Sequence, residues 1–130
     1  QYLVDKRLKI LEEADTVLAA KYCAIVGLQL SSPEVGKTAV LSEEEKKNPL
    51  LSLLNTVVDN GIISQINTID ITHAFDIQFG YKDRFTVKIG TVDDLDKKIR
   101  FMNVVIERLA ETDKGIIDVS ALPTARFRPY

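Results

Sequence analysis

Between residues 62 and 89 the apolar residues fall on alternate positions, and this period constrains the fold more than any other feature of the chain. Alternation places successive side chains on opposite faces of a β-strand. Three strands are therefore expected, carrying Ile69 and Ile71, then Phe75, Ile77 and Phe79, then Phe85, Val87 and Ile89. Gly80-Tyr81-Lys82-Asp83 has the composition of a hairpin loop, so the second and third strands should pair antiparallel.

A segment with helical spacing precedes these strands. Ser42 and Glu45 have the spacing of a capping box, and Pro49 suits a first helical turn. Asn60-Gly61 provides a C-terminal stop. The expected core face of this helix consists of Leu50, Leu51, Leu53, Leu54, Val57 and Val58.

A second helix is expected after the strands, with Thr91 as its N-cap and Asp94 at the third helical position. Asp96 and Arg100 should pair across one turn on its exposed face, and Lys114-Gly115 should end it. Its expected apolar stripe is Leu95, Ile99, Met102, Val105, Ile106 and Leu109.

The two ends of the chain complete the predicted fold. Residues 2–11 have two apolar runs around Asp5-Lys6-Arg7, which is typical of a hairpin, and residues 12–41 are expected to be extended and irregular. Residues 116–119 and 125–128 are expected to be strands, and Pro129 should end the last one. The order predicts one α+β domain over residues 1–130, with a mainly antiparallel sheet and two helices packed on one face.

Charge and residue usage argue against several functions. Seventeen basic and 19 acidic residues give a net charge of −2, and no Lys/Arg cluster forms a surface for nucleic acid. The longest apolar stretch without charge, residues 49–58, is shorter than the roughly 20 residues of a membrane-spanning helix. Nucleic acid is therefore not an expected partner.

Catalytic and metal-binding constellations are also missing from the sequence. The single His, His73, and the single Cys, Cys23, are 50 positions apart, so neither a zinc site nor a Ser or Cys nucleophile with a His base is expected. The acidic runs at 43–45 and 93–96 lie in expected first helical turns, where the partial positive charge of the helix N-terminus stabilises carboxylates. We therefore expect no enzymatic activity and no cofactor, and Cys23 is interpreted as a buried small apolar residue.

Several stretches together resemble the C-terminal extracytoplasmic domain of the bacterial cell-division protein family FtsQ, called DivIB in Gram-positive bacteria. They are Tyr2-Leu3-Val4-Asp5 through Leu11, Val26-Gly27-Leu28, Val35-Gly36, Lys88-Ile89-Gly90-Thr91, Gly115-Ile116-Ile117-Asp118-Val119-Ser120 and Ala125-Arg126-Phe127-Arg128-Pro129. The chain departs from the family at Lys6-Arg7-Leu8, where a Gly-containing turn is usual. In order and spacing, the resemblance covers nearly the whole chain.

The resemblance implies a non-catalytic role at the division septum, on the extracytoplasmic face of the cell membrane. It also implies a cytoplasmic tail, one membrane helix and a POTRA domain before this region, and partners of the FtsB (DivIC) and FtsL type. The family's partner contact maps largely onto the last strand. The implied partner-binding residues are Ser120, Ala121, Ala125, Arg126, Phe127 and Arg128.

Other interpretations of the same residues stay open. In the last strand, Ala125 and Phe127 could simply face the core while Arg126 and Arg128 are solvated charges, and a strand can do this and still bind through its backbone edge. A small-molecule-binding or sensor domain is the alternative function, and an enzyme that uses carboxylates alone is a more distant one.

Overall fold

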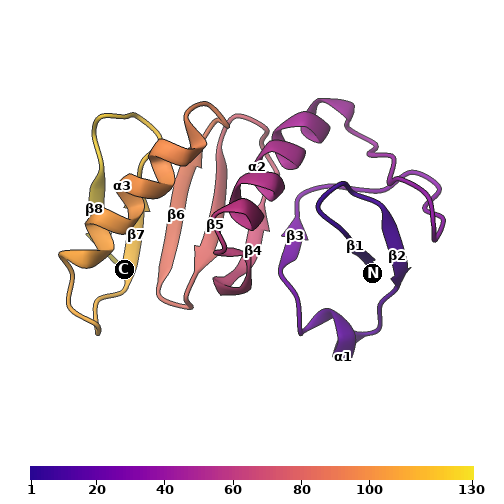
Figure 1. The fold of residues 1–130 in the computed structure, drawn as a ribbon, viewed down its shortest axis with the longest axis horizontal. Coiled ribbons are helices and arrows are strands. Elements are labelled where there is room, and N and C mark those ends of the chain that lie inside the picture. Colours follow the sequence, from indigo (N-terminus) through magenta and orange to yellow (C-terminus); the bar gives the residue numbers. More distant parts are fainter.

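Six strands form one mixed sheet in the spatial order β3-β4-β5-β6-β7-β8 (Figure 1). In this computed structural model, which describes residues 1–130, β3 is parallel to β4 and β6 is parallel to β7, while the other three neighbouring pairs are antiparallel. The strands are β3 (Ala24–Val26), β4 (Ile66–Asp70), β5 (Ile77–Tyr81), β6 (Phe85–Gly90), β7 (Gly115–Asp118) and β8 (Arg126–Pro129). The predicted α+β class and the mostly antiparallel sheet are confirmed.

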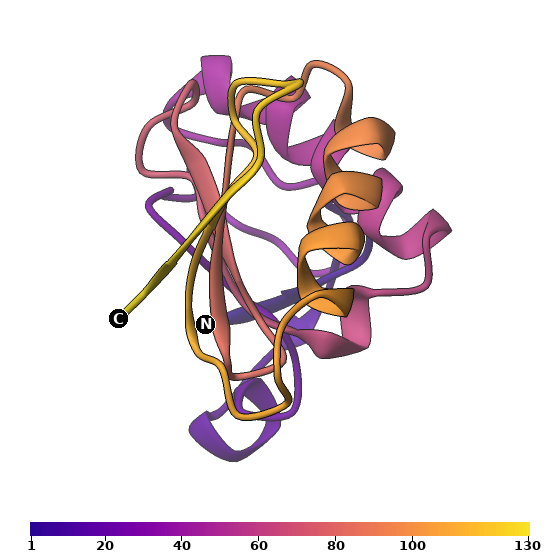
Figure 2. The same ribbon diagram turned by 90° about the vertical axis from the view of Figure 1, so that its left-hand side faces the viewer.

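Two long helices cover one face of this sheet, as Figure 2 shows: α2 (Lys47–Asp59) and α3 (Leu95–Glu107). The core lies between the helices and the sheet, and the predicted alternation of buried residues is found in β4, β5 and β6. The innermost side chains include Leu50, Leu53, Val57, Ile69, Ile77, Phe79, Val87, Ile89, Met102 and Ile117. Val105 and Ile106 of the predicted stripe are only half-buried. The other face of the sheet has no helix on it.

The predicted hairpin joins β5 and β6. Lys82 and Asp83 both have left-handed backbone angles, with φ of 56° and 53°, and Arg84 N–H donates to the carbonyl of Tyr81 at 3.1 Å. This geometry is a type I′ turn, which matches the twist of paired strands. Two details of the prediction are wrong: Gly80 and Tyr81 belong to β5 rather than to the loop, and Phe75 lies in the preceding loop with 78% of its surface exposed.

The first helix begins without the predicted capping box. The backbone around Ser42 pairs instead with the segment at Gln29: Ser42 N–H donates to the carbonyl of Gln29 at 2.9 Å, so this N–H does not take part in a capping box. A 3-10 turn, η1 (Glu44–Lys46), then leads into α2, and neither has a side-chain cap. The predicted stop is confirmed, since α2 ends at Asp59 and Gly61 has a φ of 71° that favours glycine.

The second helix starts later and ends earlier than predicted. Its N-cap is Asp94, with a φ of 54°, while the Thr91 hydroxyl donates to Asp93 Oδ2 at 3.2 Å. The ammonium of Lys98 donates to the carbonyls of Ile89 and Thr91, on either side of Gly90, whose φ of 68° turns the chain before the helix. The predicted pair of Asp96 with Arg100 does not form, because Asp96 Oδ1 accepts from Asn60 Nδ2 at 3.1 Å.

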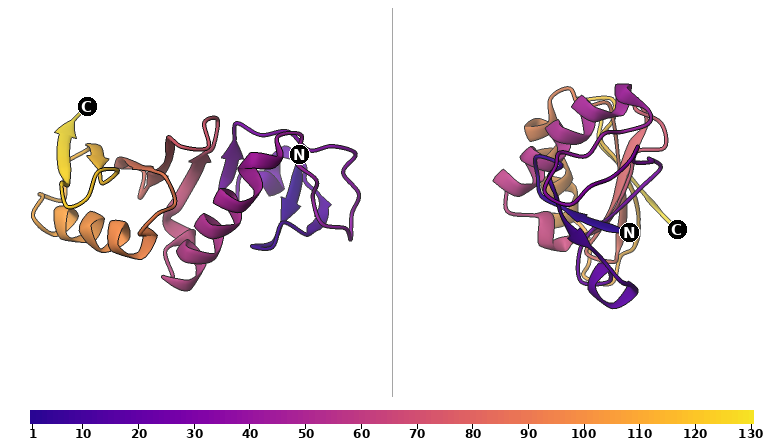
Figure 3. Two further views of the ribbon diagram at one scale, coloured as in Figure 1. Left: turned by 90° about the horizontal axis from the view of Figure 1, so that it is seen from above. Right: turned by 90° about the vertical axis from the view of Figure 1, so that its right-hand side faces the viewer.

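The N-terminal third forms a layer beyond β3, at the opposite end of the molecule from β8 (Figure 3). The predicted hairpin is confirmed as the antiparallel pair β1 (Tyr2–Val4) and β2 (Ile10–Glu13). Within residues 12–41, the stretch 12–21 could be read from the sequence as a loop or a helical turn, and it contains the short helix α1 (Thr16–Ala19). The strand β3 in the same segment was not predicted. The last 3-10 turn, η2 (Ile63–Gln65), precedes β4.

The six-stranded sheet consists of two units with the same topology, β3-α2-β4-β5 and β6-α3-β7-β8. Each unit has a parallel pair connected through a helix, followed by an antiparallel strand. Equivalent rows of paired residues are Val26–Asp70–Gln78 and Lys88–Asp118–Arg126. β6 pairs with β5, so the second unit extends the sheet of the first.

Equivalent side-chain interactions are found within each of the two units. Asp70 Oδ1 accepts from the amide and hydroxyl of Thr72 at 2.9 and 2.7 Å, and Asp118 Oδ1 accepts from those of Ser120 at 2.9 and 2.6 Å. The two buried charged side chains, Lys46 and Lys98, occupy equivalent places. Their ammonium groups donate to carbonyls near the ends of β3 and β6: that of Gly27, just after β3, at 2.6 Å, and that of Ile89, one residue before the end of β6, at 2.8 Å.

Candidate functional site

The predicted partner-binding strand, β8, lies at one edge of the sheet. Its single neighbour is β7, with the pairs Gly115↔Pro129, Ile116↔Arg128, Ile117↔Phe127 and Asp118↔Arg126. Gly115 allows this close pairing, because a Cβ at that position would collide with the carbonyl of Arg128. The opposite side of β8 is therefore a free strand edge.

The hydrogen bonds of β7 decide which groups of β8 face outward. The amides of Gly115 and Val119 donate to the carbonyls of Arg84 and Lys88, so the odd-numbered residues of β7 use their backbone groups on β6. The even-numbered residues Ile116 and Asp118 consequently bond with Arg128 and Arg126. The amide of Tyr130, which donates to Lys114 at 3.3 Å, fits this pattern. The outward groups of β8 are therefore the N–H and C=O of Phe127 and the C=O of Pro129, which has no N–H.

The side chains of β8 divide between the two faces of the sheet. Phe127 is half-buried on the helix-covered face, where its ring makes an edge-to-face contact with Phe85 at 6.3 Å between centroids. Arg126 and Arg128 are exposed on the open face, and Ala125 is half-buried just before the strand. The predicted core-facing and solvated positions are thus both found, on a strand that keeps its outer edge free.

Ser120 and Ala121 lie in the turn that connects β7 to β8, and both are exposed. The amide and hydroxyl of Ser120 donate to Asp118 Oδ1. Ser120 packs closely against Gly90, because a Cβ added to that glycine would lie only 3.0 Å from the Cβ of Ser120. Burial raises the pKa of Asp118, but the hydrogen bonds from Ser120, together with the charges of Lys88 and Arg126, outweigh this and hold the pKa below its usual range. Ser120 is therefore near the end of β6 rather than on the free edge with Phe127.

Phe75 is an exposed aromatic residue that the sequence assigned to a strand. Its carbonyl oxygen lies 4.0 Å from the position of a Cβ on Gly90, the residue that also contacts Ser120. Phe75 is thus close to the predicted turn residues at this end of the sheet. The sequence did not reveal that Phe75 is exposed, because it fits the alternating pattern and alternation alone does not show where a strand begins.

No catalytic arrangement comes together in the structure. No group of three or more His, Cys, Asp or Glu side chains is placed to hold a metal ion. Cys23 is half-buried, and burial raises the pKa of its thiol to about 11, so the nucleophilic thiolate is scarce at neutral pH. None of the helices combines the length and apolar character that crossing a membrane requires.

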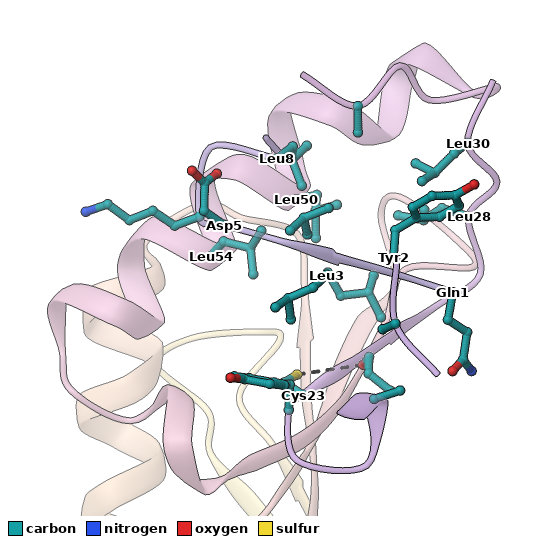
Figure 4. Close-up of a pocket in the computed structure, with 18 of the residues that line it drawn as sticks. Gln1, Tyr2, Leu3, Asp5, Leu8, Cys23, Leu28, Leu30, Leu50 and Leu54 are labelled. Atoms are coloured by element: carbon teal, nitrogen blue, oxygen red, sulfur yellow. Dashed lines mark hydrogen bonds between the residues drawn. The ribbon is translucent and has the colours of Figure 1, made fainter. Parts of the chain in front are cut away.

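A large apolar cavity lies at the other end of the molecule, between the N-terminal hairpin and β3. Its volume is about 720 Å³, and 18 of its 23 lining residues are hydrophobic. Figure 4 shows Tyr2, Leu3, Cys23, Leu28 and Leu50 among its walls. Its volume is within the usual range of ligand pockets, roughly 300–1,000 Å³.

Comparison with known proteins relates the chain to cell-division proteins. It is 25% identical over 122 residues to two proteins called cell division protein DivIB, from the Hall and Loch Maree strains of Clostridium botulinum. The match covers 92% of this chain and 47% of each relative, so the chain spans about half the length of the curated relatives it matches. No protein-family model matches the chain, and no solved structure does.

Proposed function

We propose that this chain is a non-catalytic interaction domain of a division protein of the FtsQ/DivIB type, which holds partner division proteins of the FtsB/DivIC and FtsL type at the septum. The full-length protein would be anchored in the cell membrane by one helix outside this chain, with this domain on the extracytoplasmic face. The observation that carries the proposal is the free edge of β8, whose Phe127 N–H and C=O point outward. Similarity to DivIB over 92% of the chain supports the division role.

The repeated topology suggests how a partner strand would lie. β5 is the equivalent of β8 in the first unit, and its outer edge is covered by β6, which runs antiparallel to it. A partner strand on β8 would take the place that β6 takes on β5. We therefore propose that the partner strand adds antiparallel to β8, through backbone hydrogen bonds with Phe127 and Pro129.

The same comparison suggests the side chains of the partner. Phe79, the equivalent of Phe127, pairs with Val87 of β6, so an aliphatic residue is expected opposite Phe127 on the helix-covered face. On the open face, Arg126 and Arg128 favour acidic residues in the partner. The proposed ligand is thus an extended segment with apolar residues on one side and carboxylates on the other.

Proline at position 127 tests the edge. Phe127→Pro removes the outward N–H, whereas Phe127→Ala removes the same aromatic ring and keeps that N–H. An edge strand tolerates proline where its N–H faces solvent. In calorimetric titrations with soluble FtsB/DivIC-type and FtsL-type fragments, we expect Phe127→Pro to bind about tenfold more weakly than Phe127→Ala.

A second proline serves as the control. Arg126→Pro removes an N–H that bonds to β7, so this variant should lose stability, which circular dichroism during urea unfolding would detect. Equal affinities of folded Phe127→Pro and Phe127→Ala would show that the partner uses another surface. Absence of binding by the parent chain to either fragment would contradict the proposed partners.

A further inference from the structure

The apolar cavity lies between two strand edges that have no partner. β1 is paired on one side only, with β2, and β3 is paired on one side only, with β4. Tyr2, Val4 and Ile25 from these two strands all line the cavity. In the view of Figure 1, β1 lies on the side of the hairpin nearer β3.

The hydrogen bonds at the two ends of β1 show which of its backbone groups are free. Ala14 N–H donates to the carbonyl of Gln1 at 2.8 Å, and Asp5 N–H donates to the carbonyl of Lys9 at 3.1 Å. The pair contains a β-bulge between Leu3 and Val4, with the extra residue, Leu11, in β2, so the alternation along β1 is kept. Leu3 therefore bonds with β2, as Gln1 and Asp5 bond with the chain beside them, while the N–H and C=O of Tyr2 and Val4 point away from β2. No protein group bonds with these outward groups.

The same reasoning applies to β3. Ile71 N–H donates to the carbonyl of Val26 at 3.0 Å, so Ala24 and Val26 use their backbone groups on β4. The N–H and C=O of Ile25 therefore face away from β4, and the structure contains no partner for them. Both walls of the cavity thus combine apolar side chains with unpaired backbone donors and acceptors.

We propose that this cavity binds an extended peptide segment, which inserts as a strand between β1 and β3 and joins the two sheets. An apolar small molecule or acyl chain would fill the volume but would leave the backbone groups of Tyr2, Val4 and Ile25 without partners, and unpaired buried backbone groups are costly. A peptide strand satisfies both requirements. The aliphatic walls select apolar side chains on the peptide, and no buried charge in the lining selects a charged one.

The test uses the 130-residue chain and three probes. The first is an acetylated seven-residue peptide with valine at alternate positions, threonine between them and lysine at each end. The second has the same side chains with the alternate amides N-methylated, and the third is decanoic acid. We expect saturable binding of the first peptide, at least about tenfold weaker binding of the methylated one, and no competition by decanoic acid.

Amide exchange and thiol labelling locate the binding. The bound peptide should slow hydrogen exchange at Tyr2, Val4 and Ile25 and leave the amide of Phe127 unchanged, which separates this site from the edge of β8. It should also slow the reaction of Cys23, a cavity residue, with a disulfide reagent. Protection at Phe127 alone would overturn the proposal.

Two variants of Ile25 provide the matched comparison. Ile25→Pro removes the outward N–H, and Ile25→Ala truncates the side chain but keeps that N–H. We expect Ile25→Pro to bind the peptide about three- to tenfold more weakly than Ile25→Ala. If Ile25→Pro fails to fold, Tyr2→Pro against Tyr2→Ala makes the same comparison on β1. Equal binding of the methylated peptide or of decanoic acid would identify a purely apolar ligand site and overturn the strand proposal, as would the absence of any binding.

Discussion

Replacing Lys98 by methionine tests how the end of β6 is held. The Lys98 ammonium is almost fully buried and donates to the carbonyls of Ile89 and Thr91, both at 2.8 Å. Methionine keeps a stem of similar length and leaves both carbonyls without this donor. Each lost hydrogen bond to a charged group costs about 1.5–3 kcal/mol of unfolding free energy. Against this loss, the variant no longer buries a charge; that burial is unfavourable in the parent, where it lowers the pKa of Lys98.

The net effect of Lys98→Met is therefore expected to be a loss of about 2–3 kcal/mol of unfolding free energy, measured by urea denaturation. Lys97→Met is the control, because Lys97 is exposed and should change stability by less than about 0.5 kcal/mol. Lys46→Met should resemble Lys98→Met, since Lys46 donates to Gly27 in the equivalent place. A Lys98→Met protein as stable as the parent would mean that desolvation cancels the hydrogen bonds, and the reasoning would be refuted.

Three further predictions concern the core, acid stability and the binding edge. Leu53→Ala should cost about 2–5 kcal/mol because Leu53 is fully buried, and Ile106→Ala about 1–2 kcal/mol because that side chain is half-exposed; urea curves compare them. Hydrogen bonds from Thr72 hold the pKa of Asp70 below its usual value, so the stability difference between parent and Asp70→Ala should be constant above about pH 4 and shrink as the pH falls through the lowered pKa. Arg126→Glu should slow partner association in stopped-flow experiments at low salt, and added salt should remove the difference.

The sequence predicts well those elements whose pattern is local and long. Apart from Phe75, the alternation from Ile69 to Ile89 and the stripe from Leu50 to Val57 are found as buried faces, because a strand or helix of this length must bury one side. Helix boundaries were less predictable. Lys98 holds the chain before α3 through hydrogen bonds to residues nine and seven positions earlier, and no capping motif carries that information.

The candidate site was predictable in position but not in chemistry. The last strand was placed correctly within one residue, since β8 covers Arg126–Pro129 and includes the proline that was expected to end it. The direction of each N–H depends on register with β7, which comes from long-range pairing. Arg126 and Arg128, two positions apart, necessarily point their N–H groups the same way, so only Phe127 between them can test the outer edge.

β3 shows most clearly what the sequence could not reveal. It has three residues and pairs parallel with β4, where each partner residue is 44 positions further along the chain, so it has neither the length nor the hairpin partner by which a strand is recognised. Its recognition in space changes the interpretation of the sheet, because β3 and β8 are then the two free edges. Each edge is protected in a different way: β8 is short and carries two arginines and a proline, and β3 is withdrawn behind an apolar cavity. Such edges disfavour open-ended self-pairing, and each still presents enough backbone groups to accept one strand of matching chemistry.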